Sequence, residues 1–484
     1  MKKIYITAIV LFIGCLAFYA CKKAGNHNSP FNADNSKDSE IGALLACNFV
    51  TLSGNITTNT TLSAANVYKL DGCVTVKAGA TLTIPAGTKL LGMKTPTAGG
   101  ESALIVERGA QLVAVGTATN PIVFTSDQNP GLRAPGDWVG LRLFGRANNN
   151  NANSLPVDLG CAIQIGGGTN NADNSGRLQF VQVNFAGALA SANDLSQSGI
   201  MFNSVGDATL VDHIQISNSK NDGLFAAGGK VKLNNILTYN SDRTDYRISY
   251  GNISKIQFLA AMRMNAAAIP SASAYGIDIS NHPTALTSAP LTKPVISNFT
   301  IMGPKYCGAA TINNNFQNAI RFFNNGAGEI YNGVASGWNG RGLLIQGQPS
   351  VAQTASNNLQ FSYNSFHNTA TPFAFTAVGT WPVSGGCDNT IAAWITGSGT
   401  ASCKEAGNQF SVATLGYDAS FCGNYCATGF SQNFVLGSTT LLAANFGWDT
   451  TSSFTHPSYR GAFGSTSWTQ GWTDMCSEST NYCL

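Results

Sequence analysis

Charged side chains are scarce in this sequence. Lys, Arg, Asp and Glu make up 11% of its 484 residues and leave a formal net charge of +3, whereas about 25% is usual in globular domains. Lys and Arg form no cluster of the kind that neutralises phosphates. We therefore expect no nucleic-acid partner.

Motifs for several common chemistries are also missing. The sequence has no Gly-x-Ser-x-Gly elbow and no Gly-x-x-x-x-Gly-Lys phosphate loop, which argues against nucleotide chemistry. It has no paired Cys-x-x-Cys knuckles, and its five histidines are scattered, so we expect no metal site of the zinc type. Nothing long enough reads as an amphipathic helix.

The N-terminus carries the pattern of an export signal. Lys2 and Lys3 precede an apolar run over residues 4–20, and Cys21 follows. This order predicts a lipoprotein signal peptide over 1–20, with Cys21 carrying lipid after cleavage. The alternatives are cleavage before Cys15 and an uncleaved anchor, for which the run is shorter than the roughly 20 apolar residues of a spanning helix. Removing 1–20 takes away two lysines and no acid, so the formal charge falls to +1.

Ten cysteines remain after Cys15 and Cys21 are set aside, an even number that predicts disulfides in an exported chain. Short loops favour local bridges. We expect three pairs, namely Cys47 with Cys73, Cys387 with Cys403, and Cys476 with Cys483. The sequence leaves open the partners of Cys161, Cys307, Cys422 and Cys426.

Internal repeats predict the architecture. Residues 74–84 return as 104–114 at an offset of 30, and 209–219 return as 231–241 at an offset of 22, with looser copies at 295–303 and 330–338. Short strands separated by Gly, Asn and Asp turns, repeated at variable spacing, are typical of a solenoid with loops inserted at its turns. We therefore expect an all-β fold, a single-stranded right-handed parallel β-helix.

The chain divides by composition into four parts. Residues 21–45 are rich in Asn, Ser, Lys and Asp, which is typical of a flexible tether. The β-helix is expected over 46–380. Because both ends of a stack of coils expose strand edges, we assign residues 45–70 to an N-terminal cap and the aromatic, cysteine-rich stretch 381–484 to further coils and a disulfide-bearing C-terminal cap.

Five segments carry a distinctive pattern, namely GNITTNTTLSAANVYKLDG (54–72), GATLTIPAGT (79–88), LIVERGAQLVAVGTATNPIVFTSD (104–127), RAPGDWVGLRLFGRA (133–147) and YRGAFGSTSWTQGWT (459–473). In these segments the chain resembles a large family of exported β-helix proteins of Gram-negative bacteria. The resemblance implies a pectate-lyase-like fold, and most members of the family have no established activity.

The resemblance would allow a calcium site in the coils that contain residues 221–229 and 241–252. Calcium prefers several carboxylate or carbonyl oxygens, but Phe225, Arg243 and Arg247 stand where relatives would have acids. We therefore expect no calcium there, and no other cofactor.

Catalysis on this fold would require acids on neighbouring coils. Hydrolysis needs two carboxylates, and β-elimination from a uronate needs a base with a group that neutralises the uronate. The candidates are Asp212, Asp222, Asp242, Asp245 and Arg247, beside Lys220 and Arg243. A turn-forming role for Asp222 and Asp242 competes with this hypothesis.

His213 follows Asp212 and suggests a catalytic pair. Aligning the repeats instead places His213 in a column with Gln182, Asn235, Asn298 and Asn332. Amide-like side chains stacked in this way can hydrogen-bond one another along the coils, so we expect a structural role for His213.

Aromatic side chains are candidates for stacking on sugar rings, namely Trp338, Tyr363, Trp381 and Trp394, although aromatics in such a fold also fill cores and seal caps. The sequence thus favours a lipid-anchored outer-membrane β-helix protein that binds a glycan or another surface macromolecule without catalysis. The alternatives are a lyase or hydrolase acting on an acidic polysaccharide and a purely structural surface protein. The sequence does not distinguish the periplasmic from the exterior face.

Overall fold

The computed structural model describes residues 47–263, 273–307, 312–376, 390–412 and 443–483, together with Leu415, Tyr417, Cys422, Cys426 and Phe434. All of these belong to one compact unit. The predicted signal peptide, the lipidation site Cys21 and the tether lie outside the described residues. Among the described residues no helix combines the length and the apolar character that crossing a bilayer requires.

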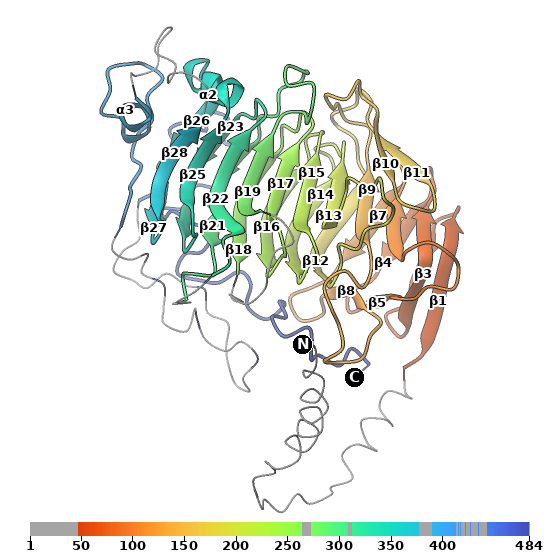
Figure 1. The fold of residues 1–484 in the computed structure, drawn as a ribbon. Helices are drawn as coiled ribbons and strands as arrows, with labels where there is room; N and C mark the ends of the chain where they lie inside the picture. The colour runs from red at the N-terminus through yellow and green to blue at the C-terminus, as the bar shows by residue number, and fades with distance from the viewer. Residues whose placement is uncertain are drawn as a thin grey trace, which may run out of the picture. The chain divides into compact units, whose positions relative to one another are not determined.

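The chain winds into a parallel β-helix, as the repeats predict (Figure 1). Strands of one coil pair in parallel with strands of the next, and the pairs Val74–Leu104 and Val211–Leu233 confirm the offsets of 30 and 22. Ile296 pairs with Ile330, so the looser copies are also successive coils. Three stacks of strands result.

The first stack contains the short strands and the first halves of the long ones, β2 (Thr60–Thr61), β4 (Thr81–Ile84), β7 (Gln111–Val115), β12 (Gly176–Asn184), β14 (Leu210–Ser217), β16 (Lys232–Tyr239), β18 (Lys255–Met262), β20 (Val295–Ser297), β23 (Gly328–Tyr331) and β26 (Leu359–Ser362). The second stack contains β5 (Lys89–Gly92), β8 (Ile122–Ser126), the second halves of β12, β14, β16 and β18, and then β21 (Thr300–Met302), β24 (Val334–Ser336) and β27 (Ser365–His367).

The third stack contains β6 (Ala103–Val106), β9 (Gly140–Phe144), β13 (Ser198–Asn203), β15 (Asp222–Ala227), β17 (Tyr246–Ser249), β19 (Ala274–Ser280), β22 (Phe316–Phe323), β25 (Arg341–Gln346) and β28 (Thr371–Thr376). Strand β1 (Phe49–Ile56) belongs to the first coil, and β3 (Val67–Val76), which pairs with it in parallel, belongs to the next coil. The described segments also contain one antiparallel hairpin, β10 (Leu155–Asp158) with β11 (Ile163–Gly166), and the helices α2 (Gln348–Ala355) and α3 (Ile391–Thr396).

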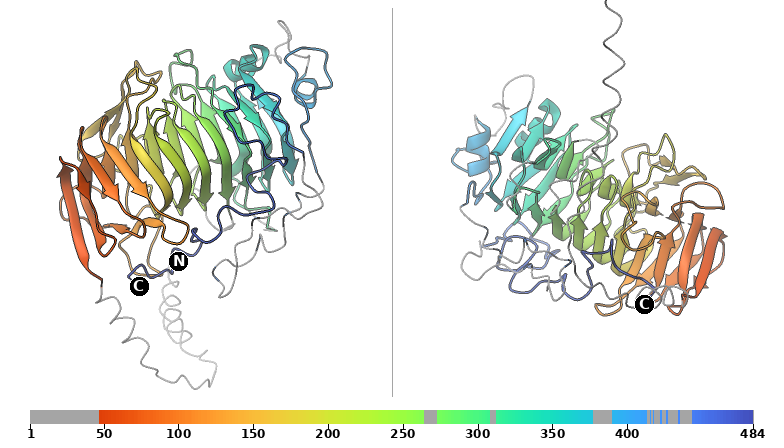
Figure 2. Two further views of the ribbon diagram at one scale, coloured as in Figure 1. Left: turned by 180° about the vertical axis from the view of Figure 1, so that it is seen from behind. Right: turned by 60° about the horizontal axis from the view of Figure 1, so that its bottom comes forward.

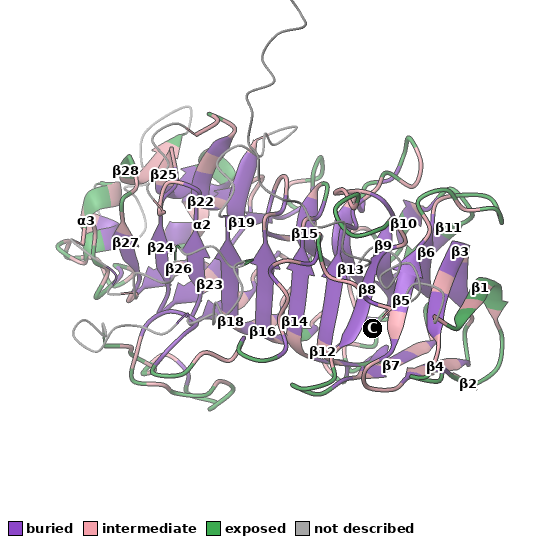
Figure 3. Cartoon of the chain, turned by 90° about the horizontal axis from the view of Figure 1, so that it is seen from below, coloured by how far each residue is buried: buried purple, intermediate pink, exposed green. Residues whose placement is uncertain are grey.

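Apolar side chains from all three stacks fill the interior, which Figure 3 shows as buried strands along the solenoid. Val74, Leu104 and Leu141 are fully buried, and they pair in succession on three neighbouring coils. Burying a leucine contributes about 2 kcal/mol, and repeating this ladder stabilises every coil against its neighbours.

Corners between the first two stacks require a left-handed backbone. His213, Asn235 and Asn298 have φ of +55°, +53° and +54°. Asn adopts this conformation more readily than most residues, which explains why Asn recurs there.

The two ends of the solenoid are formed in different ways. Residues 45–70 do not form a separate cap, because β1 is itself the edge strand and pairs in parallel with β3. At the other end, Trp394 and Ile395 of α3 are buried against the core, so residues 390–412 do cover that end.

Residues 443–483, which we call the strap, do not lie on an end of the solenoid. The strap starts beside Asn332 near β23, contacts Gln182 of β12, and reaches the first coil at Cys483 (Figure 2, left). It therefore runs lengthwise along the corner between the first two stacks.

The disulfides bind distant parts of the chain, and two of the expected local pairs are wrong. Four bonds join described cysteines, namely Cys47–Cys483, Cys73–Cys161, Cys307–Cys422 and Cys426–Cys476. Cys403 is also disulfide-bonded, and its expected partner, Cys387, lies outside the described residues. Local pairing fails because the strap brings Cys483 back to the first coil.

Candidate functional site

A groove of about 680 Å³ lies between the outer face of the first stack and strap residues 452–455. Four successive coils, those of β12, β14, β16 and β18, form its floor. Two rows of side chains cross these coils, because residues two apart on a strand share a face. Neighbouring coils are spaced by about 4.8 Å.

One row is mainly basic. Arg177 pairs with Leu210, and Leu210 pairs with Lys232. Lys255 occupies the next position, because the neighbouring residues Leu233 and Ile256 are paired. Arg177 and Lys232 are exposed, and the ammonium group of Lys255 donates a hydrogen bond to the Ser453 hydroxyl.

The other row offers hydrogen-bonding groups. Gln179, Asp212, Asn234 and Gln257 are paired in succession. Asn234 donates to Asp212 at 3.3 Å. Together the rows combine cations with amide groups, an arrangement suited to a polar, anionic ligand.

The charges that line the groove are unequal. Its four cations are Arg177, Lys230, Lys232 and Lys255, and its two acids are Asp207 and Asp212. Lys230 is paired with Asp207 at 3.1 Å. The lining therefore keeps a positive excess, although the chain as a whole is nearly neutral.

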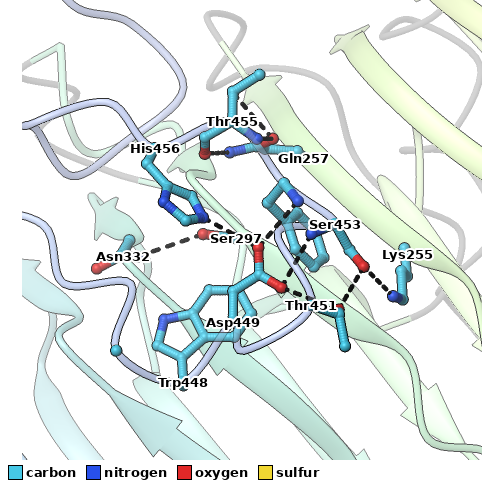
Figure 4. A network of polar contacts seen from close by, with 12 residues as sticks. Lys255, Gln257, Ser297, Asn332, Trp448, Asp449, Thr451, Ser453, Thr455 and His456 are labelled. Carbon is cyan, nitrogen blue, oxygen red and sulfur yellow. Dashed lines mark hydrogen bonds and ion pairs between the residues drawn. The ribbon is translucent and has the colours of Figure 1, made fainter.

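Asp449 shapes the strap loop that forms the groove's outer wall (Figure 4). Its carboxylate accepts hydrogen bonds from the backbone amides of Ser453 and Phe454, both at 3.0 Å, and lies 3.0 Å from Nε2 of His456. Burial raises the pKa of Asp449, but these hydrogen bonds and one from Thr451 outweigh it and lower the pKa to about 2. The ionised carboxylate thus organises the loop.

Acid should therefore loosen this wall. Because the folded pKa of Asp449 lies below its ordinary value of 3.8, the stabilisation is present above pH 4 and is lost as the pH falls toward 2. We expect wild-type protein to lose about 1–2 kcal/mol across this window relative to Asp449→Asn, which lacks the titrating group. Thermal melting at a series of pH values measures the difference, and equal pH profiles for the two proteins would contradict the assignment.

Side-chain amides of the solenoid hold the strap through its backbone. Gln257 donates to the carbonyl of Thr455 at 2.7 Å and accepts from its amide at 3.0 Å. Gln215 forms the same pair of bonds with Asp474, and Asn332 with Asn445. These paired hydrogen bonds satisfy backbone amides and carbonyls of the strap, which is irregular and has almost no strand pairing of its own.

The predicted amide column needs correction around His213. Gln182 pairs with Gln215, not with His213, and its amide donates to the carbonyl of Trp472. The residue that precedes His213 in the column is Phe180, whose ring stacks on the imidazole at 4.5 Å. Asn298 and Asn332 hydrogen-bond the strap.

His213 packs beneath the strap. Its ring meets the edges of Trp468 and Trp472 at 6.0 and 5.8 Å, and its Nδ1 lies 2.8 Å from Asp212. We expect His213→Asn to cost about 1 kcal/mol through lost aromatic contacts. His213→Val should cost about 2–3 kcal/mol, because a β-branched residue also strains the left-handed backbone. Chemical denaturation tests this order, and equal stability of the three proteins would contradict it.

The candidate catalytic acids do not come together. Asp212 lies in the groove, whereas Asp222 is fully buried at the start of β15 in the third stack. Among the described residues, no hydrogen bond or ion pair joins Asp212 to Asp222, Asp242 or Asp245. The cluster expected from the sequence is therefore split between two faces of the solenoid.

Two arginines form ion pairs with the carboxylate of Asp222. Nε of Arg243 donates to it at 2.7 Å, and Arg247 lies 3.7 Å away, with its guanidinium group over the ring of Phe225. Asp222 is thus a buried ion-pair partner and not a turn former. Arg247 is partly exposed and also donates to the carbonyl of Leu195.

The two remaining candidate acids, Asp245 and Asp242, also form ion pairs. Asp245 is fully buried and accepts from Nε of Arg263 at 3.0 Å, and burial raises its pKa to about 6. Asp242 lies 3.9 Å from Lys220, and burial raises its pKa as well. Of the candidate acids, Asp212 alone lines the groove.

Two of the aromatic candidates cannot stack on a ligand. Trp338 and Trp394 are fully buried in the core, and Trp381 lies outside the described residues. Tyr363 is partly exposed and lines a second, smaller hollow.

The basic row was not identified from the sequence. The 22-residue repeat already places Leu210 beside Lys232, and an offset of 23 residues to the next coil leads to Lys255. The strap had no such signal, because it is attached through isolated amides and not through a repeat.

In the described part of the chain, three potential metal ligands lie close together, namely Cys426, Cys476 and Glu478. The two cysteines form a disulfide, which leaves no thiolate for a metal.

Comparison with known proteins gives two findings. A family model described as a pectate-lyase-like beta helix domain matches residues 54–419. Among solved structures, the crystal structure of the Dettilon tailspike protein is similar at 12% identity and a TM-score of 0.20, over 67% of this chain and 62% of that one. The match thus spans less than two thirds of the tailspike chain. Curated proteins give no significant match.

Proposed function

The chain belongs to the pectate-lyase-like β-helix family, and on that premise we propose that it is an exported, lipid-anchored protein that binds an acidic glycan in the groove between the solenoid and the strap. The observation that carries this proposal is the basic row of Arg177, Lys232 and Lys255 beside a row of amides. A glycan lying along the solenoid would meet one cation or one amide at nearly every coil.

The proposed ligand is an extended chain, not a compact molecule. The groove crosses four coils. A spacing of about 4.8 Å between coils is comparable to the length of one sugar unit, so carboxylate or sulfate groups on successive units could each reach a cation. Phe454 in the strap wall and the half-exposed Leu210 on the floor offer apolar contact to the sugar faces.

Binding of acidic oligosaccharides tests the proposal. Residues 46–484 would be titrated by calorimetry with oligomers of galacturonate, alginate and a glycosaminoglycan. We expect the double variant Lys232→Glu/Lys255→Glu to lose affinity by about tenfold or more, with weaker salt dependence. Lys89→Glu on β5, which does not line the groove, serves as the control. Absence of wild-type binding to any acidic glycan, or equal binding by both variants, would overturn the proposal.

We further propose that the groove holds the glycan without cleaving it. Asp222 and Asp245 are buried in ion pairs with arginine, so Asp212 is the remaining candidate base in the groove. We expect no unsaturated or hydrolysed product from the same glycans, with or without calcium. Product formation that Asp212→Asn abolishes in a folded protein would replace this reading with a polysaccharide lyase or hydrolase.

The proposed location is the outer membrane, through lipid on Cys21. The support is the pattern of lysines, apolar run and cysteine at the N-terminus. Labelling cells with a fatty-acid probe should mark the wild type and not Cys21→Ser. Continued labelling of that variant would move the anchor to Cys15.

A further inference from the structure

A second hollow of about 330 Å³ lies further along the first stack. The two rows that form the groove floor continue into it. Lys255 pairs with Val295, Val295 with Glu329, and Glu329 with Gln360. The groove and the hollow are thus parts of one face, and Figure 4 places the Asp449 loop between Lys255 on one side and Asn332 on the other.

The hollow has a different chemistry from the groove. Its aromatic wall is Trp448 stacked on Tyr331, with centroids 4.1 Å apart and ring planes 13° apart. Gln360, Asn357 and Asn445 supply amides around it. The basic row ends before this point, because Glu329 and Gln360 take the positions that Lys232 and Lys255 occupy in the groove.

Glu405 is a buried acid among the residues that line this hollow. Its side chain is 5% exposed and accepts a hydrogen bond from the Ser362 hydroxyl at 2.6 Å. No cation among the described residues forms an ion pair with it. The hollow's own cation, Lys404, is exposed and donates to the carbonyl of Gly399, while Glu329 is paired with Lys293 at 2.8 Å.

A buried carboxylate without a cation is costly, and a bound cation would compensate it. Burial raises the pKa of Glu405 to about 7, and the charge of Glu329 acts in the same direction. An ammonium group would favour the ionised form and displace the proton. Aromatic faces also attract ammonium groups.

We propose that this hollow is a second subsite, which takes an amine-bearing sugar unit, with Glu405 as the partner of the ammonium group and Trp448 against the sugar face. This inference rests on the proposed function, because the hollow extends the same glycan-binding face. It adds a class of ligand that the basic groove would repel.

The experiment compares a glucosamine tetramer with its fully N-acetylated form by calorimetry on residues 46–484. We expect the wild type to bind the free amine, and Glu405→Gln to lose about tenfold in affinity for it, as for a hydrogen bond to a charged group. Glu107→Gln, which removes a similar charge at a residue that does not line the hollow, should bind as the wild type does. Trp448→Leu tests the aromatic wall separately, and should also weaken binding.

Equal binding of the two tetramers by the wild type, or unchanged affinity in Glu405→Gln, would overturn the inference. Titrating Glu405→Gln with a galacturonate oligomer separates this failure from that of the proposed function. If galacturonate binds the wild type and the variant alike while the amine does not bind, the second subsite alone is wrong. If galacturonate, alginate and the glycosaminoglycan all fail to bind the wild type, the failure belongs to the groove.

Discussion

Replacing Asp222 by alanine should cost about 3–5 kcal/mol in the free energy of unfolding, because it removes the fully buried partner of two arginines and leaves them without their counter-charge. Arg243 reaches the Asp222 carboxylate with two nitrogens, and the acid is 0% exposed. The carboxylate also accepts from the backbone amide of Thr244 at 3.3 Å. Both the pairing of β15 with β17 and the turn before β17 depend on it.

The measurement is chemical denaturation of Asp222→Ala beside two further variants. Asp242→Ala removes a neighbouring acid whose ion pair with Lys220 is long, and should cost less than about 1 kcal/mol. Asp222→Ala/Arg243→Met removes both charges and should recover part of the loss. If Asp222→Ala were as stable as Asp242→Ala, the carboxylate would not be the buried partner that we describe.

Removing the bond between Cys47 and Cys483 should release the end of the strap. This disulfide joins the first coil to the penultimate residue, across a sequence separation of 436. Bonds that close long loops stabilise proteins by about 2–5 kcal/mol. We therefore expect Cys47→Ser/Cys483→Ser to lose a few kcal/mol and to be cut by proteases within residues 470–483.

A matched control is Cys73→Ser/Cys161→Ser, which removes the bond between β3 and the loop of the β10–β11 hairpin. That variant should lose stability without exposing the strap. The strap end has other attachments, since Arg133 donates to the carbonyls of Ser477 and Thr480 at 2.6 and 2.7 Å. Unchanged protease resistance without the Cys47–Cys483 bond would mean that these contacts suffice.

The solenoid could be predicted because each repeat pairs with the next repeat along the chain. Each coil repeats apolar positions such as Val74 and Leu104, and strand pairing between successive coils follows directly from their offset. The left-handed corners also leave a sequence signal, since Asn235 and Asn298 recur where φ is positive. Physical periodicity therefore predicts both the architecture and the register.

The strap could not be predicted because its contacts have no period. Gln215 binds Asp474 across 259 residues through one pair of hydrogen bonds, and nothing in either segment reveals the other. The expected pairs Cys47–Cys73 and Cys476–Cys483 were wrong for the same reason. The entropy of loop closure favours disulfides between cysteines that are close in the sequence. In the folded chain, however, the strap places Cys483 beside Cys47.

The candidate site was predicted only in part. Asp212 was identified and lines the groove, but its expected partners lie on another face because Asp222 follows the corner into the third stack. These acids are close in the sequence and were therefore expected to form one cluster, but the solenoid places them on different faces. The basic row was missed because its members stand on different coils, where only the alignment of repeats brings them together.

The most direct test of the glycan-binding groove is lysine footprinting by mass spectrometry. Residues 46–484 would be treated with an amine-reactive reagent with and without the tightest-binding acidic oligosaccharide. The account predicts that modification of Lys232 and Lys255 falls in the presence of the glycan, while that of Lys89 and Lys305, which do not line the groove, stays the same. Protection at Lys89 or Lys305 with none at Lys232 and Lys255 would contradict it.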